Sequence, residues 1–276
     1  MTSAVRPRQL SMGFMLSASG RKRYSPVLNV EINRKGVLDV DTVKGCTFGM
    51  SAYPRGGCYG ECYAARNALR CGIDFATAVS RQFCDICHRA TIIKAMNKYP
   101  IGWYRVGTSG DPSHDWVHTI AVLRELRWTR KTPVIITKHW LELSDKQIGD
   151  LRWLQAVVNT STSGLDTDPE IQYRVSQLMR LRSAGVRSVC RVVTCDFGDS
   201  DWARACKEKQ EYLLSLSPVI DNPLRIRSSN PWVMNGDVRA MRRGDSIGGG
   251  KLVSLHDRSV YLGACDACPD QCGAAN

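Results

Sequence analysis

Short apolar runs typical of strands alternate with longer runs typical of helices from about residue 27 to residue 228. This alternation constrains the fold most, because strands separated by helices of about ten or more residues pair in parallel βαβ units. Strands are expected at residues 27–32, 103–107, 133–137, 155–160, 187–194 and 218–226. Helices are expected at residues 63–70, 75–97, 115–128, 144–154, 169–182 and 201–214.

About six βα units follow, too few for an eight-unit closed barrel and enough for an open barrel or a doubly wound sheet. We therefore predict an α/β fold whose main body spans residues 27–228. A basic arm, residues 1–26, precedes it, and a small extension with metal-binding cysteines, residues 229–276, follows it. In either architecture ligands bind at the carboxyl ends of the strands, so functional side chains are expected there.

The composition narrows the class of protein. A chain of 276 residues, 43% of them hydrophobic, suffices for one sizeable core. No apolar run approaches the roughly 18–20 residues that span a membrane, and the first residues lack the apolar stretch of a secretory signal. We expect a cytoplasmic protein with no membrane partner. The net charge of +12 favours a polyanionic partner, nucleic acid above all.

Twelve cysteines in such a chain favour metal binding or redox chemistry over disulfides, because cytosolic thiols stay reduced. The first group, Cys46, Cys58 and Cys62, follows the first expected strand, and nearby glycines let its loop wrap closely around a bulky ligand. Thiolates are the usual ligands of iron–sulfur clusters, and three of them leave one iron of a four-iron cluster open. Zinc or plain structural thiols are the alternative.

The other cysteines differ in how strongly their spacing indicates metal. A tight group flanked by turn residues is expected to bind a second iron–sulfur cluster or zinc: Cys265, Cys268 and Cys272. A second group either binds metal or packs inside a helix: Cys71, Cys84 and Cys87. The remaining three lie in strand and helix patterns and are expected in the core: Cys190, Cys195 and Cys206.

A cysteine trio after the first strand of a six-unit β/α chain resembles the radical S-adenosylmethionine (SAM) superfamily. That superfamily usually spaces its cysteines more closely than the eleven and three residues that separate them here. The stretched trio ending in Cys62-Tyr63-Ala64 is closer to a group of phage-encoded radical-SAM-like proteins. The resemblance implies a partial (β/α)6 barrel and a [4Fe–4S] cluster that binds SAM and is held by Cys46, Cys58 and Cys62.

A second motif strengthens the resemblance. Many radical SAM enzymes carry Gly-Gly-Glu-Pro after the second strand, where it meets the amino group of SAM. Here Ser109-Gly110-Asp111-Pro112 follows the strand expected at residues 103–107. A carboxylate suits an ammonium ion, and Gly110 permits close backbone approach. A plain strand-to-helix turn, with Asp111 capping the next helix, is the alternative.

The ends of three further strands supply the other candidates. In the resembled fold the fourth and fifth strand ends contact the SAM carboxylate and ribose, which implies cofactor-binding roles for Ser161 and Arg191. A strand arginine pointing to solvent is the alternative for Arg191. Lys138 and His139 end the third strand, and either one is a candidate to face the substrate.

The resemblance implies an enzyme that takes an electron from a reductant such as flavodoxin or ferredoxin and cleaves SAM to start radical chemistry. The charge and the phage-like trio favour a nucleic-acid base or nucleotide as substrate, for example a modified thymine of phage DNA in the host cytoplasm. A free nucleotide, a peptide, a tRNA and irradiated DNA remain open. The rival interpretation is a non-catalytic nucleic-acid-binding protein whose cysteines bind zinc or iron–sulfur for structure alone.

Overall fold

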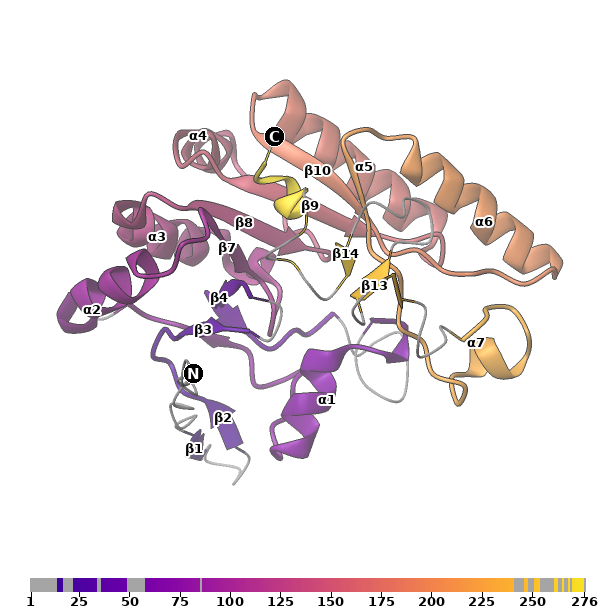
Figure 1. Ribbon diagram of the computed structural model, residues 1–276, viewed down its shortest axis with the longest axis horizontal. Coiled ribbons are helices and arrows are strands. Elements are labelled where there is room, and N and C mark those ends of the chain that lie inside the picture. The colour runs from indigo at the N-terminus through magenta and orange to yellow at the C-terminus, as the bar shows by residue number, and fades with distance from the viewer. Residues whose placement is uncertain are drawn as a thin grey trace.

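The computed structural model of the protein describes most of the chain. The described residues are 14–16, 22–33, 36–48, 58–84, 86–240, 246–247, 251–253, 261–262, 265, 268 and 270–275. Within them the fold is α/β, as expected, and it is organised around a seven-stranded sheet (Figure 1).

Six strands of this sheet run parallel, and a seventh is antiparallel at one edge. Their order is β11-β10-β9-β8-β7-β4-β3. The parallel strands are β4 (Leu38–Val40), β7 (Trp103–Val106), β8 (Thr132–Thr137), β9 (Val157–Thr162), β10 (Arg187–Val192) and β11 (Val219–Asp221). The antiparallel edge strand is β3 (Val30–Ile32).

In the described part of the chain, six helices lie between the parallel strands along the sequence. They are α1 (Tyr63–Arg70), α2 (Ile86–Asn97), α3 (Trp116–Leu126), α4 (Asp145–Trp153), α5 (Asp168–Ser183) and α6 (Asp201–Leu214). The short α7 (Pro231–Met234) follows the last of these strands. Short 3-10 turns are η1 (Cys58–Gly60), η2 (Pro112–Asp115), η3 (Arg127–Thr129) and η4 (Gln271–Gly273). None of the described helices is long and apolar enough to cross a membrane.

Small pairings lie outside the main sheet. β1 (Phe14–Leu16) pairs with β2 (Lys22–Tyr24), and β5 (Val43–Lys44) pairs with β6 (Ser80–Arg81). Near the C-terminus β13 (Lys251–Val253) lies between β12 (Ser246–Ile247) and β14 (Tyr261–Leu262).

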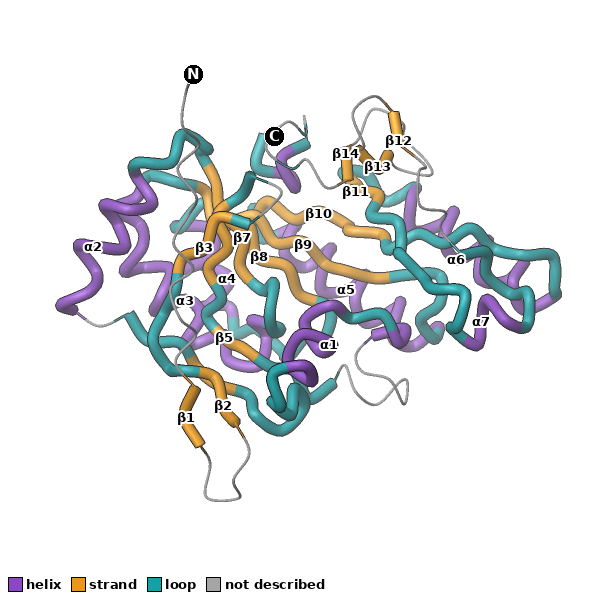
Figure 2. Tube along the Cα trace, turned by 60° about the horizontal axis from the view of Figure 1, so that its bottom comes forward, coloured by secondary structure: helices purple, strands orange, loops and turns teal. Residues whose placement is uncertain are grey.

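The sequential strand order decides where the helices lie. From β4 to β11 each parallel strand pairs with the one before it in the chain, so every crossover moves in the same direction. Because such crossovers are right-handed, they place their helices on one face of the sheet. Figures 1 and 2 show α2 to α6 on that face. A doubly wound sheet would reverse its order midway, and this one does not.

The two faces of the sheet have different partners. On the helix face Tyr104, Ile135 and Val158 join a buried cluster with Leu123 of α3 and Leu151 of α4. The alternate residues face the other way, and we call that side the open face.

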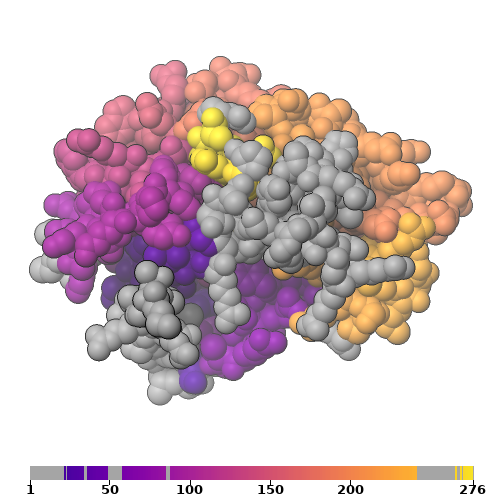
Figure 3. Space-filling model, viewed as in Figure 1, coloured from indigo at the N-terminus to yellow at the C-terminus, as the bar shows by residue number. Residues whose placement is uncertain are grey.

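C-terminal residues cover part of the open face. Cys265, Cys272 and Ala274 pack there against the apolar residues Val37, Trp103, Val134, Val157, Val189 and Ile220. Asn159 Nδ2 donates a hydrogen bond of 3.0 Å to the Cys272 carbonyl. Figure 3 shows C-terminal residues in yellow on the face of the molecule that it presents.

Two sequence expectations about the elements need correction. The helix predicted over residues 75–97 begins only at Ile86, because the Asp74 carboxylate accepts from the amides of Ala76 and Thr77 and starts a turn. The strand expected at residues 27–32 is the antiparallel edge strand β3. The first parallel strand is instead the three-residue β4, too short to stand out as a periodic run.

Candidate functional site at the carboxyl ends of the strands

The segment that carries Cys46 lies directly against the Ser109-Gly110 turn. The Gly45 amide donates to the Ser109 carbonyl over 2.9 Å, and Gly45 and Gly110 form a parallel bridge. A Cβ on Gly110 would lie 2.4 Å from the Val43 carbonyl oxygen, so only glycine allows this approach. The fold therefore joins the two motifs that the resemblance singled out.

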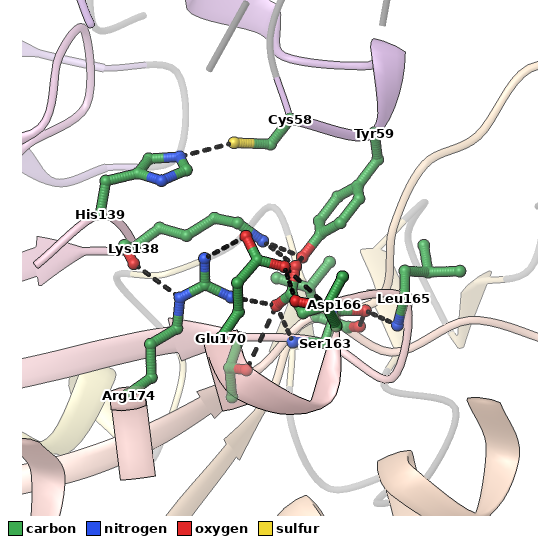
Figure 4. Close-up of polar contacts among 12 residues, drawn as sticks. Cys58, Tyr59, Lys138, His139, Ser163, Leu165, Asp166, Glu170 and Arg174 are labelled. Carbon is green, nitrogen blue, oxygen red and sulfur yellow. Dashed lines mark hydrogen bonds and ion pairs between the residues drawn. The ribbon is translucent and has the colours of Figure 1, made fainter. Parts of the chain in front are cut away.

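Two cysteines of the first trio share an apolar cluster, and the third contacts a histidine. Cys46 is buried in an apolar cluster with Ala65 and Ala68 of α1, and Cys62, which precedes that helix, packs against the same cluster. Cys58 lies in η1, where its Sγ is 3.2 Å from His139 Nε2 (Figure 4). Within the described part of the chain, no group of three or more His, Cys, Asp or Glu side chains converges closely enough to hold a metal ion.

Cys58 and His139 are both electrically neutral near pH 7. Burial raises the pKa of the Cys58 thiol to about 11, because it disfavours the thiolate more than the nearby Lys138 favours it. Burial likewise lowers the pKa of His139 to about 4, although Asp111 opposes the shift. A cysteine nucleophile needs a thiolate stabilised by an imidazolium or another positive group. As placed, the pair is therefore a neutral hydrogen bond rather than an activated nucleophile.

A buried ionic network lies beside this pair. Lys138 Nζ is 2.8 Å from Asp166 Oδ1, and an Arg174 guanidinium nitrogen is 2.6 Å from Asp166 Oδ2. The Tyr59 hydroxyl donates to Asp166 over 2.7 Å, and Lys138 also contacts Tyr59 through the hydroxyl and the ring face. Figure 4 shows these side chains converging on Asp166 from η1, the end of β8, and α5. We call Tyr59, Lys138, Asp166 and Arg174 the Asp166 network.

The Asp166 network has defined protonation states. Burial alone would raise the pKa of Asp166, but Lys138 and Arg174 more than offset it, so the pKa lies below its ordinary value. Burial, reinforced by Asp166, raises the pKa of Tyr59 well above its ordinary value. At neutral pH the network is an ionised carboxylate between two cations, with a protonated phenol donating to it.

Asp111 ties the second motif to the end of β8. Its buried carboxylate accepts from Ser113 N (3.0 Å) and Thr137 Oγ1 (2.6 Å) through one oxygen. Its other oxygen accepts from Lys138 N and His139 N, each over 2.9 Å. These four bonds fill roughly four lone-pair positions of a carboxylate. The capping alternative is observed, and a contact of Asp111 with the SAM ammonium stays a prediction.

Ser161 and Arg191 lie opposite each other on neighbouring strands of the open face. Arg191 donates to Asn222 Oδ1 over 2.8 Å and has a guanidinium nitrogen 3.9 Å from Cys272 Sγ, so its side chain does not simply point to solvent. The Asp39–Arg105 ion pair adds polar groups to the same face. Arg105 donates two hydrogen bonds to the Asp39 carboxylate, of 2.9 and 3.1 Å. The fold thus brings Ser161 and Arg191 into one polar region.

The remaining cysteines are spread over the fold. The three C-terminal ones pack on the open face through Cys265 and Cys272, over the amino-terminal half of the strands and away from the first trio. Cys71 lies near Cys62, whereas Cys84 packs against the helix-face core. The Cys87 side chain lies outside the described part of the chain. The last three are buried core residues, as expected: Cys190, Cys195 and Cys206.

Sequence reasoning missed most of the Asp166 network. It singled out Lys138 and His139 as strand-end residues but not Tyr59, Asp166 or Arg174. Asp166 follows the end of β9, and Tyr59 follows Cys58. Their positions at a strand end and beside a candidate ligand could have identified them as candidate site residues. Arg174 lies within α5, and no local pattern separates it from a surface arginine.

Comparisons with models of known protein families, with curated proteins and with solved structures found nothing that matches this chain.

Proposed function

We propose that this chain is a radical SAM enzyme built on a partial (β/α)6 barrel and that it acts on a nucleic-acid base or nucleotide. The observation that carries the proposal is the contact between the Cys46 segment and the Ser109-Gly110 turn at the carboxyl ends of the strands. The sequential parallel sheet, with helices on one face and polar groups on the other, also supports it.

The donor set of the first trio fits an iron–sulfur cluster in its chemistry. Three thiols from a single loop are soft ligands of the kind that hold such clusters. The apolar cluster around Cys46 and Cys62 would limit solvent access, which tunes the cluster potential. Cluster binding would require Cys58 Sγ to give up its contact with His139 and to bind iron instead. The C-terminal trio, Cys265, Cys268 and Cys272, is proposed to hold a second cluster or zinc.

A [4Fe–4S] cluster with SAM, when bound, supplies the 5′-deoxyadenosyl radical that takes a hydrogen atom from the substrate. Cys46, Cys58 and Cys62 would hold three of its irons. The backbone of Ser109 and Gly110 would line the place of the SAM amino group, and the Ser161 hydroxyl and Arg191 guanidinium would orient its ribose and carboxylate.

Other residues of the chain would hold the site in shape. Asp111 fixes the backbone of Lys138 and His139 at the end of β8. The Asp166 network fixes Tyr59 next to Cys58 and fills space that water would otherwise enter.

The net charge of +12 supports a polyanionic substrate. A base inside duplex DNA would have to be flipped out, or met in a single strand, to reach the strand ends. An external reductant of the flavodoxin or ferredoxin type would supply the electron in a cytoplasmic setting.

The test is reductive cleavage of SAM by protein purified without oxygen. Iron and sulfide are measured, SAM and dithionite are added, and 5′-deoxyadenosine is quantified by chromatography. We expect a cluster and 5′-deoxyadenosine from the wild type and from Cys190→Ala, a buried cysteine outside the trio. In Cys58→Ala we expect less cluster and less 5′-deoxyadenosine than in the wild type. Cleavage that survives in Cys58→Ala would refute the ligand assignment, and stoichiometric zinc without SAM affinity would favour the non-catalytic rival.

A further inference from the structure

Two tryptophans at the amino-terminal edge of the sheet, away from the cysteine trio, are unusually exposed. Trp128 in η3 is 61% exposed, and Trp153 at the end of α4 is 59% exposed. They line one hollow with Thr132, the first residue of β8, and with Gln155, two residues before β9, so they lie near the amino-terminal ends of these strands. Lys138 lies six residues along β8 from this amino-terminal edge, a distance of roughly 20 Å. Large exposed apolar side chains that gather in one place mark interaction sites.

Arg127 links the two rings into one surface. Its guanidinium carbon lies 4.7 Å from the centre of the Trp128 ring and 5.4 Å from that of the Trp153 ring, within cation–π range of both. The three side chains line a hollow of about 490 Å³ together with Arg130 and Lys131. That volume falls within the range of roughly 300–1,000 Å³ typical of ligand pockets.

A second hollow continues the first. It has a volume of about 460 Å³, shares Thr132 and Gln155 with its neighbour, and is lined by Arg152 and Arg187. None of the described residues that line either hollow is acidic. The nearby Arg124 is paired with Asp150, but no carboxylate of the described chain pairs with Arg127, Arg130 or Arg152. The aromatic hollow therefore leads into a basic one.

We propose that these joined hollows, which we call the tryptophan groove, bind single-stranded nucleic acid. Bases would stack on Trp128 and Trp153, and the phosphates would contact Arg152 and Arg187. Exposed aromatic rings beside a basic track are the recognition chemistry of single strands, since every base offers a flat face for stacking. Paired bases within a duplex have their faces covered by neighbouring bases, so duplex is a poorer ligand. This inference does not depend on the radical chemistry proposed above.

The test is binding of a fluorescein-labelled oligothymidylate of about ten nucleotides to the full-length chain, followed by fluorescence anisotropy. We expect binding that weakens as salt rises. The double variant Trp128→Ala/Trp153→Ala should bind at least about tenfold more weakly, because stacking on one aromatic ring accounts for roughly that factor. Trp202→Ala, a 40% exposed tryptophan of α6, is the matched control and should bind like the wild type.

A variant that removes one positive charge tests the proposal without changing the tryptophans. Arg152→Gln should weaken binding moderately and reduce the slope of log affinity against log salt by about one. Wild-type protein that does not bind the oligonucleotide would overturn the proposal. So would a double variant that binds like the wild type, or duplex of equal length bound as tightly as the single strand. A shift from dimer to monomer in the double variant, without an effect on oligonucleotide binding, would assign the groove to a second copy of the chain and overturn the proposal too.

Discussion

Replacing Asp166 by asparagine should destabilise the protein strongly, because Asp166 is the anion between two buried cations. The side chains of Asp166 and Arg174 are each 4% exposed, and that of Lys138 is 12% exposed. Removing one partner of such a group leaves uncompensated buried charge, which costs about 3–5 kcal/mol. At roughly 2–4 °C per kcal/mol for a domain of this size, the melting temperature should fall by about 6–20 °C.

Urea denaturation at pH 7, followed by circular dichroism, measures this loss directly. Asp145→Asn is the matched control, because Asp145 pairs with Arg180 but its side chain is 96% exposed. We expect its unfolding free energy to equal that of the wild type within error, since exposed pairs contribute little. If Asp166→Asn lost less than about 1 kcal/mol, the claim that Asp166 compensates buried cations would be wrong.

Three further predictions concern packing, pH and thiol reactivity. Gly110→Ala should lower the unfolding free energy by about 1–3 kcal/mol, because the new methyl group would meet the Val43 carbonyl; an unchanged urea midpoint would contradict this. The folded-state pKa values of Asp111 and Asp166 lie below the ordinary value of 3.8, so their stabilisation is present above about pH 4 and lost as the pH falls through the folded values. In an acid titration, the unfolding free energy of Asp166→Asn should fall less steeply with decreasing pH than that of the wild type. Burial raises the pKa of the Cys190 thiol to about 12, so it should resist alkylation at pH 8 in native protein and react only after unfolding, as mass spectrometry of labelled peptides would show.

Periodicity predicted the larger elements because their signals are local. The helix expected at residues 201–214 and the helix expected at residues 63–70 match α6 and α1 at both ends. The helix expected at residues 144–154 matches α4, whose N-cap is Ser144; the Ser144 hydroxyl accepts from the Gln147 amide. Periodicity failed between residues 74 and 85, where a turn set by Asp74 overrides an apolar pattern, and at β4, whose three residues are too few for a period to show.

The candidate site was predictable where it follows from strand ends and unpredictable where it depends on long-range pairing. The positions of Ser161, Arg191 and Lys138 follow from parallel strands that end at one edge of a sheet. The ion pair between Asp166 and Arg174 could not be foreseen, because it depends on how α5 rotates against the sheet. Three of the four bonds that occupy Asp111 likewise come from β8 and the two residues that follow it, and only the bond from Ser113 comes from its own turn.

Electron paramagnetic resonance of the dithionite-reduced protein, recorded before and after SAM is added, tests the central claim most directly. The proposed function predicts a cluster signal that changes when SAM binds the open iron and that is lost when Cys46, Cys58 and Cys62 are all replaced by alanine. A protein that contains no reducible cluster, or a SAM-responsive signal that survives the triple replacement unchanged, would contradict it.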